Sequence, residues 1–103
     1  MIALKNRAMA LMAVVLTVAA ANVSAYTGQE LAKEAKFSMK QARQIALNAH
    51  PGRITDEELE REKGGTGLRY SFDILQDKVT QEVGIDAKTG SVLENAPEGP
   101  NPE

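Results

Sequence analysis

Residues 38–50 carry apolar side chains at helical spacing. The stripe consists of Met39, Ala42, Ile45, Ala46 and Ala49. Ser38 and Gln41 have the spacing of a capping box, and Pro51-Gly52 is typical of a helix end. Because the alanines of the stripe are small, we expect this helix to pack closely against a flat surface such as a sheet. Leu47 lies off the stripe, so we expect it to be exposed or covered by the segment that precedes the helix.

Two later runs alternate between apolar and polar side chains. In the first, Leu68, Tyr70, Phe72 and Ile74 alternate with Arg69, Ser71 and Asp73, and in the second, Val79, Gln81, Val83 and Ile85 alternate with Thr80, Glu82 and Asp86. A short turn at 76–78 separates the runs, which predicts an antiparallel hairpin with one buried face. We expect Tyr70 and Phe72 to point toward the helix. Residues 86–90 predict a second turn, in which Asp86 accepts backbone hydrogen bonds.

Residues 53–63 fit two kinds of structure. Their charged composition, with Asp-Glu-Glu-Leu-Glu-Arg-Glu-Lys at its centre, slightly favours a helix by propensity. Only Ile54 and Leu59 are apolar, which is too few for a helical stripe, so a solvent-facing edge strand is the alternative. The glycines of residues 64–67 predict a turn after this segment.

The N-terminus has the pattern of a cleavable secretory signal. Lys5 and Arg7 form a positive start, residues 8–21 are uncharged and largely apolar, and Val23-Ser24-Ala25 resembles a signal peptidase site. The apolar run of about 14 residues is shorter than the ~20 residues that a membrane-spanning helix needs. We therefore expect residues 1–25 to be removed and the exported protein to have no stable membrane anchor.

The rest of the chain divides into an arm, one domain and a tail. Residues 26–37 are polar, and the capping-box spacing of Thr27 and Glu30 favours a short helix or an ordered arm. Residues 38–94 contain the predicted helix and strands. The prolines and glycine of residues 95–103 predict a disordered tail.

Charge and cysteine content narrow the class of protein. Removal of residues 1–25, which contain Lys5 and Arg7, takes the formal net charge from −2 to −4. This charge argues against nucleic acid and anionic membranes as partners, because both require clustered basic residues. The chain has no cysteine, so a small core or a partner must stabilise the domain without disulfides.

No catalytic motif is present in the sequence. A zinc site of the H-E-x-x-H type needs two histidines, and the chain has only His50. His50 precedes a proline at the predicted helix end, where a structural role is favoured over metal binding or catalysis. The glycines of residues 64–67 are not followed by the Lys-Ser/Thr of a phosphate-binding loop. We therefore expect a non-enzymatic protein with no cofactor and no bound metal.

An acidic run is the one concentration of charge. It consists of Asp56, Glu57, Glu58, Glu60 and Glu62. Alternate carboxylates on one face of a strand offer the oxygen ligands that Ca²⁺ prefers, but these would lie along a line instead of around a point. A solvated edge that resists aggregation is therefore the favoured interpretation.

Four segments in order resemble the PepSY domain family, which includes the propeptides of thermolysin-like peptidases. They are "SMKQARQIALNAHPG", "ELERE", "LRYSFDI" and "VGIDAKTGSVL", within residues 37–94. The resemblance implies an α+β fold in which one main helix packs on a small antiparallel sheet, so residues 53–63 would form a strand. In that pattern Thr55 and Glu57 would be apolar and face the helix, so the first strand is expected to be short, bulged or at an exposed edge.

The resemblance also implies a function, since PepSY domains are proposed to restrain peptidases. The leading hypothesis is a regulator or inhibitor of an envelope or secreted peptidase in the bacterial periplasm or medium, and the alternative is a sensor-associated or ligand- or cation-binding module. The predicted partner-binding surface is the sheet face turned away from the helix, which we expect to be polar but not strongly charged, with an acidic edge beside it. Its residues are Glu58, Glu60, Glu62, Arg69, Ser71 and Asp73, with Thr80 and Glu82 nearby.

Overall fold

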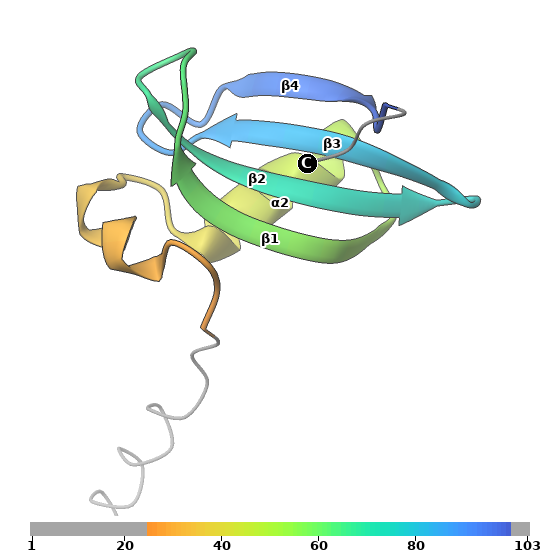
Figure 1. Ribbon diagram of the computed structural model, residues 1–103, viewed down its shortest axis with the longest axis horizontal. Helices are drawn as coiled ribbons and strands as arrows, with labels where there is room; N and C mark the ends of the chain where they lie inside the picture. The colour runs from red at the N-terminus through yellow and green to blue at the C-terminus, as the bar shows by residue number, and fades with distance from the viewer. Residues whose placement is uncertain (1–24, 100–103) are drawn as a thin grey trace, which may run out of the picture.

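One α-helix packs on one face of a four-stranded antiparallel sheet in the computed structural model, which describes residues 25–99 (Figure 1). The elements are the 3-10 helix η2 (Gln29–Glu34), α2 (Met39–Ala49), β1 (Arg53–Arg61), β2 (Leu68–Gln76), β3 (Val79–Asp86) and β4 (Val92–Pro97). The strand order in the sheet follows the chain, β1-β2-β3-β4. The predicted α+β fold is confirmed, while the predicted signal segment lies outside the described residues except for Ala25.

Helix α2 begins and ends as its sequence predicts. The Gln41 N–H donates to Ser38 Oγ over 3.1 Å, and the Ser38 N–H donates to Gln41 Oε1 over 2.8 Å, which completes the capping box. At the other end the His50 N–H donates to the Ala46 carbonyl. Leu47 is half-buried and packs against the core. No helix among residues 25–99 has the length and apolar character needed to cross a membrane.

The acidic segment forms β1, a strand at the edge of the sheet, so the helix favoured by propensity is wrong there. A register shift between Ile54 and Asp56 marks a bulge, which confirms the expected irregularity. The bulge leaves Thr55 exposed, whereas Glu57 faces α2 and pairs with Arg43. Tertiary pairing with β2 and this contact with the helix override the local helix propensity.

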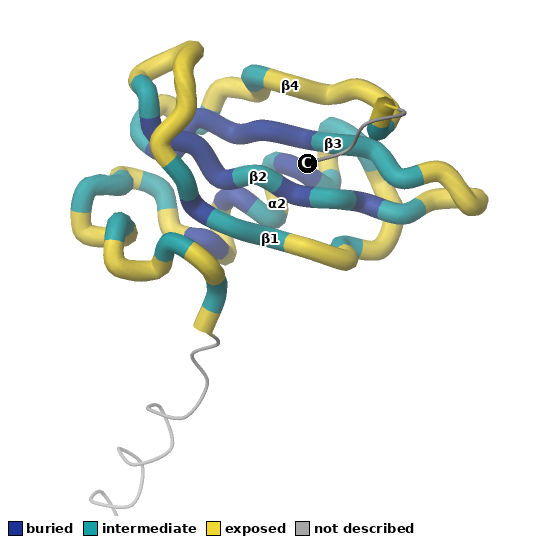
Figure 2. Tube along the Cα trace, in the orientation of Figure 1, coloured by how far each residue is buried: buried dark blue, intermediate teal, exposed yellow. Residues whose placement is uncertain are grey.

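The core lies between α2 and the sheet (Figure 2). Its buried residues are Met39, Ala42, Ala46, Leu59, Leu68, Tyr70, Phe72, Ile74, Val83, Ile85 and Ala87. Tyr70 and Phe72 are both almost fully buried, as predicted. The Tyr70 hydroxyl donates to the Phe37 carbonyl over 2.7 Å. Burial, with a smaller contribution from Tyr26, raises the pKa of Tyr70 to about 12.

The hairpin between β2 and β3 turns on two residues, Asp77 and Lys78. Both have positive φ, 50° and 68°, and Gln76 pairs with Val79 on either side of them. This conformation is typical of a type I′ turn, whose twist matches that of the flanking strands. The predicted turn is therefore confirmed.

The short helix expected in residues 26–37 is present as η2, but the predictions for its cap and for the C-terminal tail are wrong. The N-cap of η2 is Gly28, and no side chain caps this helix, so Thr27 and Glu30 do not form a capping box. At the other end β4 continues to Pro97, so Asn95, Ala96 and Pro97 belong to the sheet and not to a disordered tail. Because the Glu98 N–H donates to the Thr80 carbonyl, strand alternation turns the nitrogen of Pro97 outward, where its missing N–H costs no ladder bond.

Candidate functional site

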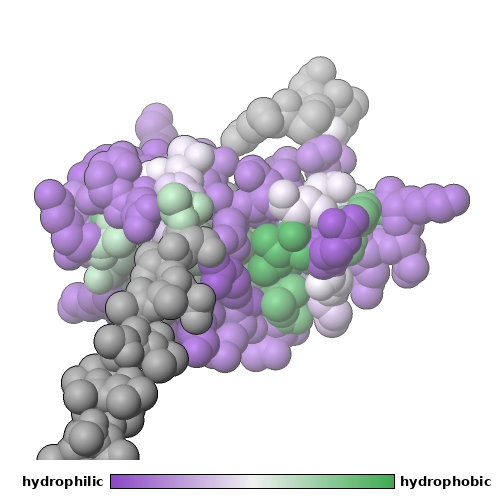
Figure 3. All heavy atoms as spheres, turned by 90° about the horizontal axis from the view of Figure 1, so that it is seen from below, coloured by the Kyte–Doolittle hydropathy of each residue, from purple (hydrophilic) through white to green (hydrophobic). Residues whose placement is uncertain are grey.

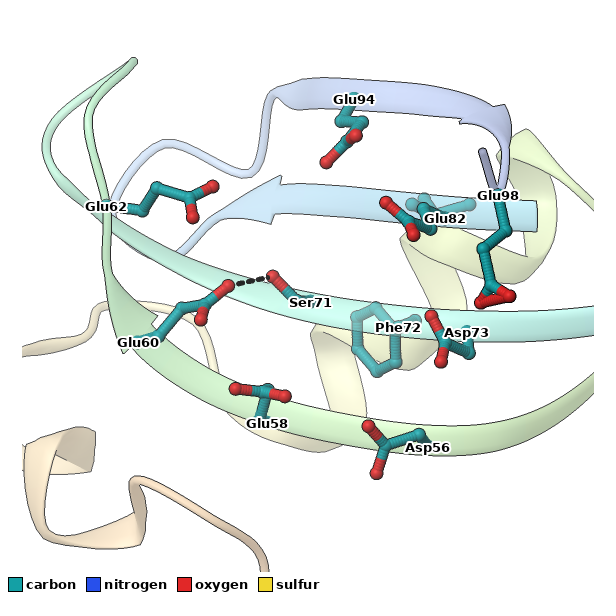
Figure 4. A pocket seen from close by; sticks show the side chains of 11 residues that line it. Asp56, Glu58, Glu60, Glu62, Ser71, Phe72, Asp73, Glu82, Glu94 and Glu98 are labelled. Carbon is teal, nitrogen blue, oxygen red and sulfur yellow. Dashed lines mark hydrogen bonds between the residues drawn. The ribbon is translucent and has the colours of Figure 1, made fainter. Parts of the chain in front are cut away.

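The sheet face opposite α2 collects carboxylates from all four strands (Figure 4). Strand pairing places Asp56, Asp73 and Glu82 in one row across β1, β2 and β3. A second row contains Glu58, Ser71, Gly84 and Glu94. Because side chains alternate between faces along each strand, residues far apart in the sequence meet on this surface. We call it the acidic face.

The acidic face encloses a shallow depression lined by eight carboxylate residues. They are Asp56, Glu58, Glu60, Glu62, Asp73, Glu82, Glu94 and Glu98, and Ser71 lies among them. No lysine or arginine is among the residues that line this depression in the described part of the chain. The prediction that this face is polar but not strongly charged is therefore wrong. The predicted acidic edge is one border of a larger anionic surface.

Arg69 lies on the acidic face, but its side chain is not available at the surface. The residue is 7% exposed, and its Nη1 lies 3.2 Å from Glu62 Oε2 and 3.4 Å from Glu94 Oε1. Its Nη2 donates to the Lys63 carbonyl over 3.1 Å. A Cβ at Gly84 would lie 3.1 Å from Nη1 of Arg69, so the bare glycine provides the space in which the guanidinium lies. Arg69 therefore joins the ends of β1 and β4.

The other predicted partner-binding residues occupy the face as expected. The Ser71 hydroxyl donates to Glu60 Oε2 over 2.6 Å, a bond drawn in Figure 4. Glu58, Glu60, Ser71 and Asp73 are half-buried, and Glu62 is exposed. The sequence interpretation missed Asp56, Glu94 and Glu98 as members of this surface. Alternation within β1 signals Asp56, but Glu94 and Glu98 join only through the pairing of β4 with β3.

Three carboxylates converge at one end of the acidic face. Oxygens of Asp73, Glu82 and Glu98 lie within 4.8 Å of one another. Figure 4 shows their side chains turned toward a common space above β2 and β3. Carboxylate oxygens are the ligands that Ca²⁺ prefers, so this end has the donor chemistry for a hard cation.

Asp86 has the structural role that its turn predicts. Its Oδ1 accepts from the Lys88 and Thr89 N–H groups and from the Thr66 hydroxyl, and its Oδ2 accepts from the Thr66 N–H. Burial opposes ionisation, but these four hydrogen bonds outweigh it and lower the pKa of Asp86 to about 2. The carboxylate thereby holds the turn after β3 against the loop between β1 and β2.

The acidic face offers hydrogen-bond and ion-pair acceptors. Ser71 donates to a glutamate, and no histidine lines the depression in the described part of the chain. His50 caps α2, on the other side of the sheet. Its eight carboxylates give this surface the chemistry to bind a basic group or a cation.

Comparison with family models matches residues 36–95 to PepSY, described as the peptidase propeptide and YPEB domain. The matched region contains α2, all of β1 to β3 and most of β4. Comparisons with curated proteins and with solved structures found no match.

Proposed function

This chain belongs to the PepSY family of peptidase propeptide and YPEB domains, and we propose that it is a non-enzymatic, exported regulator that restrains a peptidase by binding to it. Its acidic face is the proposed contact surface. Binding occludes the partner's surface without a covalent step.

The arrangement of Asp56, Asp73 and Glu82 is the observation that carries this proposal. Cross-strand neighbours of like charge destabilise a sheet, and here three carboxylates lie in one row across three strands. Residues that destabilise a fold are expected at functional sites, where their role in function offsets the loss of stability. A basic partner surface is such a compensation, because it would neutralise the row on binding.

The charge of the acidic face also affects the rate at which the domain associates with its partner. A field of one sign over a concave surface accelerates the encounter with an oppositely charged protein, and salt weakens this effect. We therefore infer that the regulated peptidase presents lysine or arginine side chains around the surface that becomes occluded.

Capture of the partner tests this function. The domain starting at Tyr26 is immobilised and exposed to extract of the host's cell envelope, and bound proteins are identified by mass spectrometry. We expect a peptidase among the proteins that bind at low salt and are eluted by high salt. We expect Asp56→Lys to abolish its capture. The matched control is Glu30→Lys, which makes the same charge change at an exposed position on η2. A capture that is equal for both variants, or that contains no peptidase, would contradict the proposal.

A cation-binding module is the second candidate, favoured by the convergence of Asp73, Glu82 and Glu98. Calcium titration followed by NMR would then shift the resonances of these three residues, and Asp73→Asn would abolish the shift. Resonances that stay unchanged at millimolar calcium would exclude this candidate and leave the peptidase proposal intact.

Export is part of the same proposal. Cleavage after Ala25 would leave a protein that begins at Tyr26, the residue just before the bridge to β1. N-terminal sequencing of the protein isolated from its host should find Tyr26 first. Protein that retains Met1 would rule out this processing.

A further inference from the structure

Residues 26–34, which we call the strap, lie against the open edge of β1. They precede the region matched to the PepSY family, which begins at residue 36. Thr27 forms a parallel bridge with Glu58, and the Leu59 N–H donates to the Thr27 carbonyl over 2.9 Å. The strap therefore occupies, at one position, the place of an additional strand.

The strap packs against the core through the partly buried side chains of Tyr26 and Leu31, and its other contacts lie at the surface. Its 3-10 helix, η2, has no buried residue. Its far end is attached by an exposed ion pair between Glu34 and Arg61. Beyond it, the Lys36 and Phe37 N–H groups donate to the Ala87 carbonyl, which fixes the chain just before α2. Release of the strap from β1 would remove the packing of Tyr26 and Leu31 but none of the buried core residues, which all lie outside residues 26–34.

Gly28 makes the close approach of the strap to β1 possible. Its φ is +88°, and a Cβ built on it would lie 1.7 Å from the Leu59 carbonyl oxygen. Any other residue would be forced away from β1 and would also be strained at this φ. The bridge of Thr27 to β1 thus depends on a single glycine.

We propose that the strap is releasable, and that the edge of β1 beneath it then accepts an extended segment of a partner protein whose side chains alternate between basic and apolar. Addition of a strand to an open edge is a common mode of peptide recognition, and Thr27 already demonstrates parallel pairing at this edge. This inference goes beyond the proposed contact at the acidic face and does not require the partner to be a peptidase.

The side chains around the edge define the chemistry of the added segment. On one side, Asp56 and Glu58 belong to the acidic face and favour basic side chains. On the other side, Tyr26 of the strap and Ile54 of β1 pack against the core beside the Arg43–Glu57 pair. Release of the strap removes Tyr26, so an apolar side chain of the added segment can take its place. Figure 3, which views the molecule from the β1 side, shows a compact apolar patch within a largely hydrophilic surface.

Hydrogen exchange at the Leu59 amide tests the release of the strap. In Gly28→Ala, we expect this amide to exchange at least ~10-fold faster than in the wild type, while the Phe72 amide in the central strand β2 is unchanged. The matched control is Gly67→Ala, because Gly67 has a similar φ of +92° but no atom within 4 Å of an added Cβ. A Leu59 amide that stays protected in Gly28→Ala would overturn the proposal.

Binding of synthetic peptides tests what the released edge accepts. An eight-residue peptide that alternates Lys and Val should restore the protection of Leu59 in Gly28→Ala, whereas a Glu-Val counterpart should not. If Gly28→Ala does not fold, Glu34→Gln replaces it, since this change weakens only the exposed pair with Arg61. Faster exchange at Leu59 that the Lys-Val peptide leaves unchanged would refute the edge as a docking site.

Discussion

The Arg43 guanidinium on α2 forms two parallel hydrogen bonds with the Glu57 carboxylate on β1. The Nε–Oε1 distance is 2.8 Å and the Nη2–Oε2 distance is 2.7 Å. The side chains are 36% and 22% exposed, so the pair is partly shielded from water. The hydrogen bonds to Glu57 raise the pKa of Arg43. An ion pair thus joins helix and strand at a position that is apolar in the family pattern.

A double-mutant cycle measures this contact. We expect Arg43→Ala and Glu57→Ala each to lower the free energy of unfolding by about 1 kcal/mol, because each removes both bonds of a well-aligned pair. The double variant should lose less than the sum of the two. Urea unfolding provides the four values, and strictly additive losses would show that the pair contributes nothing to stability.

Truncation of Phe72 tests the assignment of the core face. Phe72 is 2% exposed, so we expect Phe72→Ala to cost about 3–5 kcal/mol and to remove most of the stability of a small domain. Val79→Ala is the control, since Val79 is 51% exposed. Equal melting temperatures for Phe72→Ala and the wild type would contradict the packing described above.

Asp86 should make the domain sensitive to acid. Its folded-state pKa, about 2, lies below the ordinary value of 3.8, so its contribution to stability is complete above about pH 4 and is lost as the pH falls through 2. Near neutral pH this contribution is about 2 kcal/mol. Unfolding measured between pH 6 and pH 2 should therefore show a smaller pH dependence for Asp86→Asn than for the wild type. Parallel curves for the two proteins would contradict this role.

Arg69 should stabilise the fold by neutralising Glu62 and Glu94, and dissolved salt should partly replace this effect when Arg69 is removed. In Arg69→Met, Glu62 and Glu94 lose their shared cation, and we expect a loss of about 2 kcal/mol. Near 1 M NaCl the Debye length falls to about 3 Å, so salt should screen the remaining repulsion and recover part of this loss. Thermal unfolding at low and at high salt measures how much less stable Arg69→Met is than the wild type under each condition. A variant no more salt-sensitive than the wild type would refute this account.

The sequence correctly predicts the elements that are decided by residues close to one another along the chain. The capping box of Ser38 and Gln41 sets the start of α2, and alternation places Tyr70 and Phe72 in the core. The turn chemistry of Asp86 is equally local, although its bonds to Thr66 are not. Propensity fails for residues 53–61, because pairing with β2 and the contact with Arg43 decide their structure.

The sequence predicts the acidic face only in part, because strand register brings its members together. Alternation correctly assigns Arg69 to this face, but it does not show that Gly84 on the neighbouring strand β3 leaves room to bury the guanidinium. Glu94 reaches the face through the pairing of β4 with β3, and Glu98 reaches it because β4 extends past the predicted start of the tail. The sequence interpretation therefore identified an acidic edge where the structure has an acidic surface.

Inhibition of the captured peptidase tests the central claim, that the acidic face restrains a peptidase. The purified peptidase is assayed while the domain starting at Tyr26 is added to stoichiometric excess, at low and at high salt. We expect the wild-type domain and its Glu30→Lys variant to lower the activity of the peptidase, and we expect this inhibition to weaken at high salt. The Asp56→Lys variant should leave the activity of the peptidase unchanged. Full activity at excess wild-type domain, or equal inhibition by Asp56→Lys, would contradict the claim.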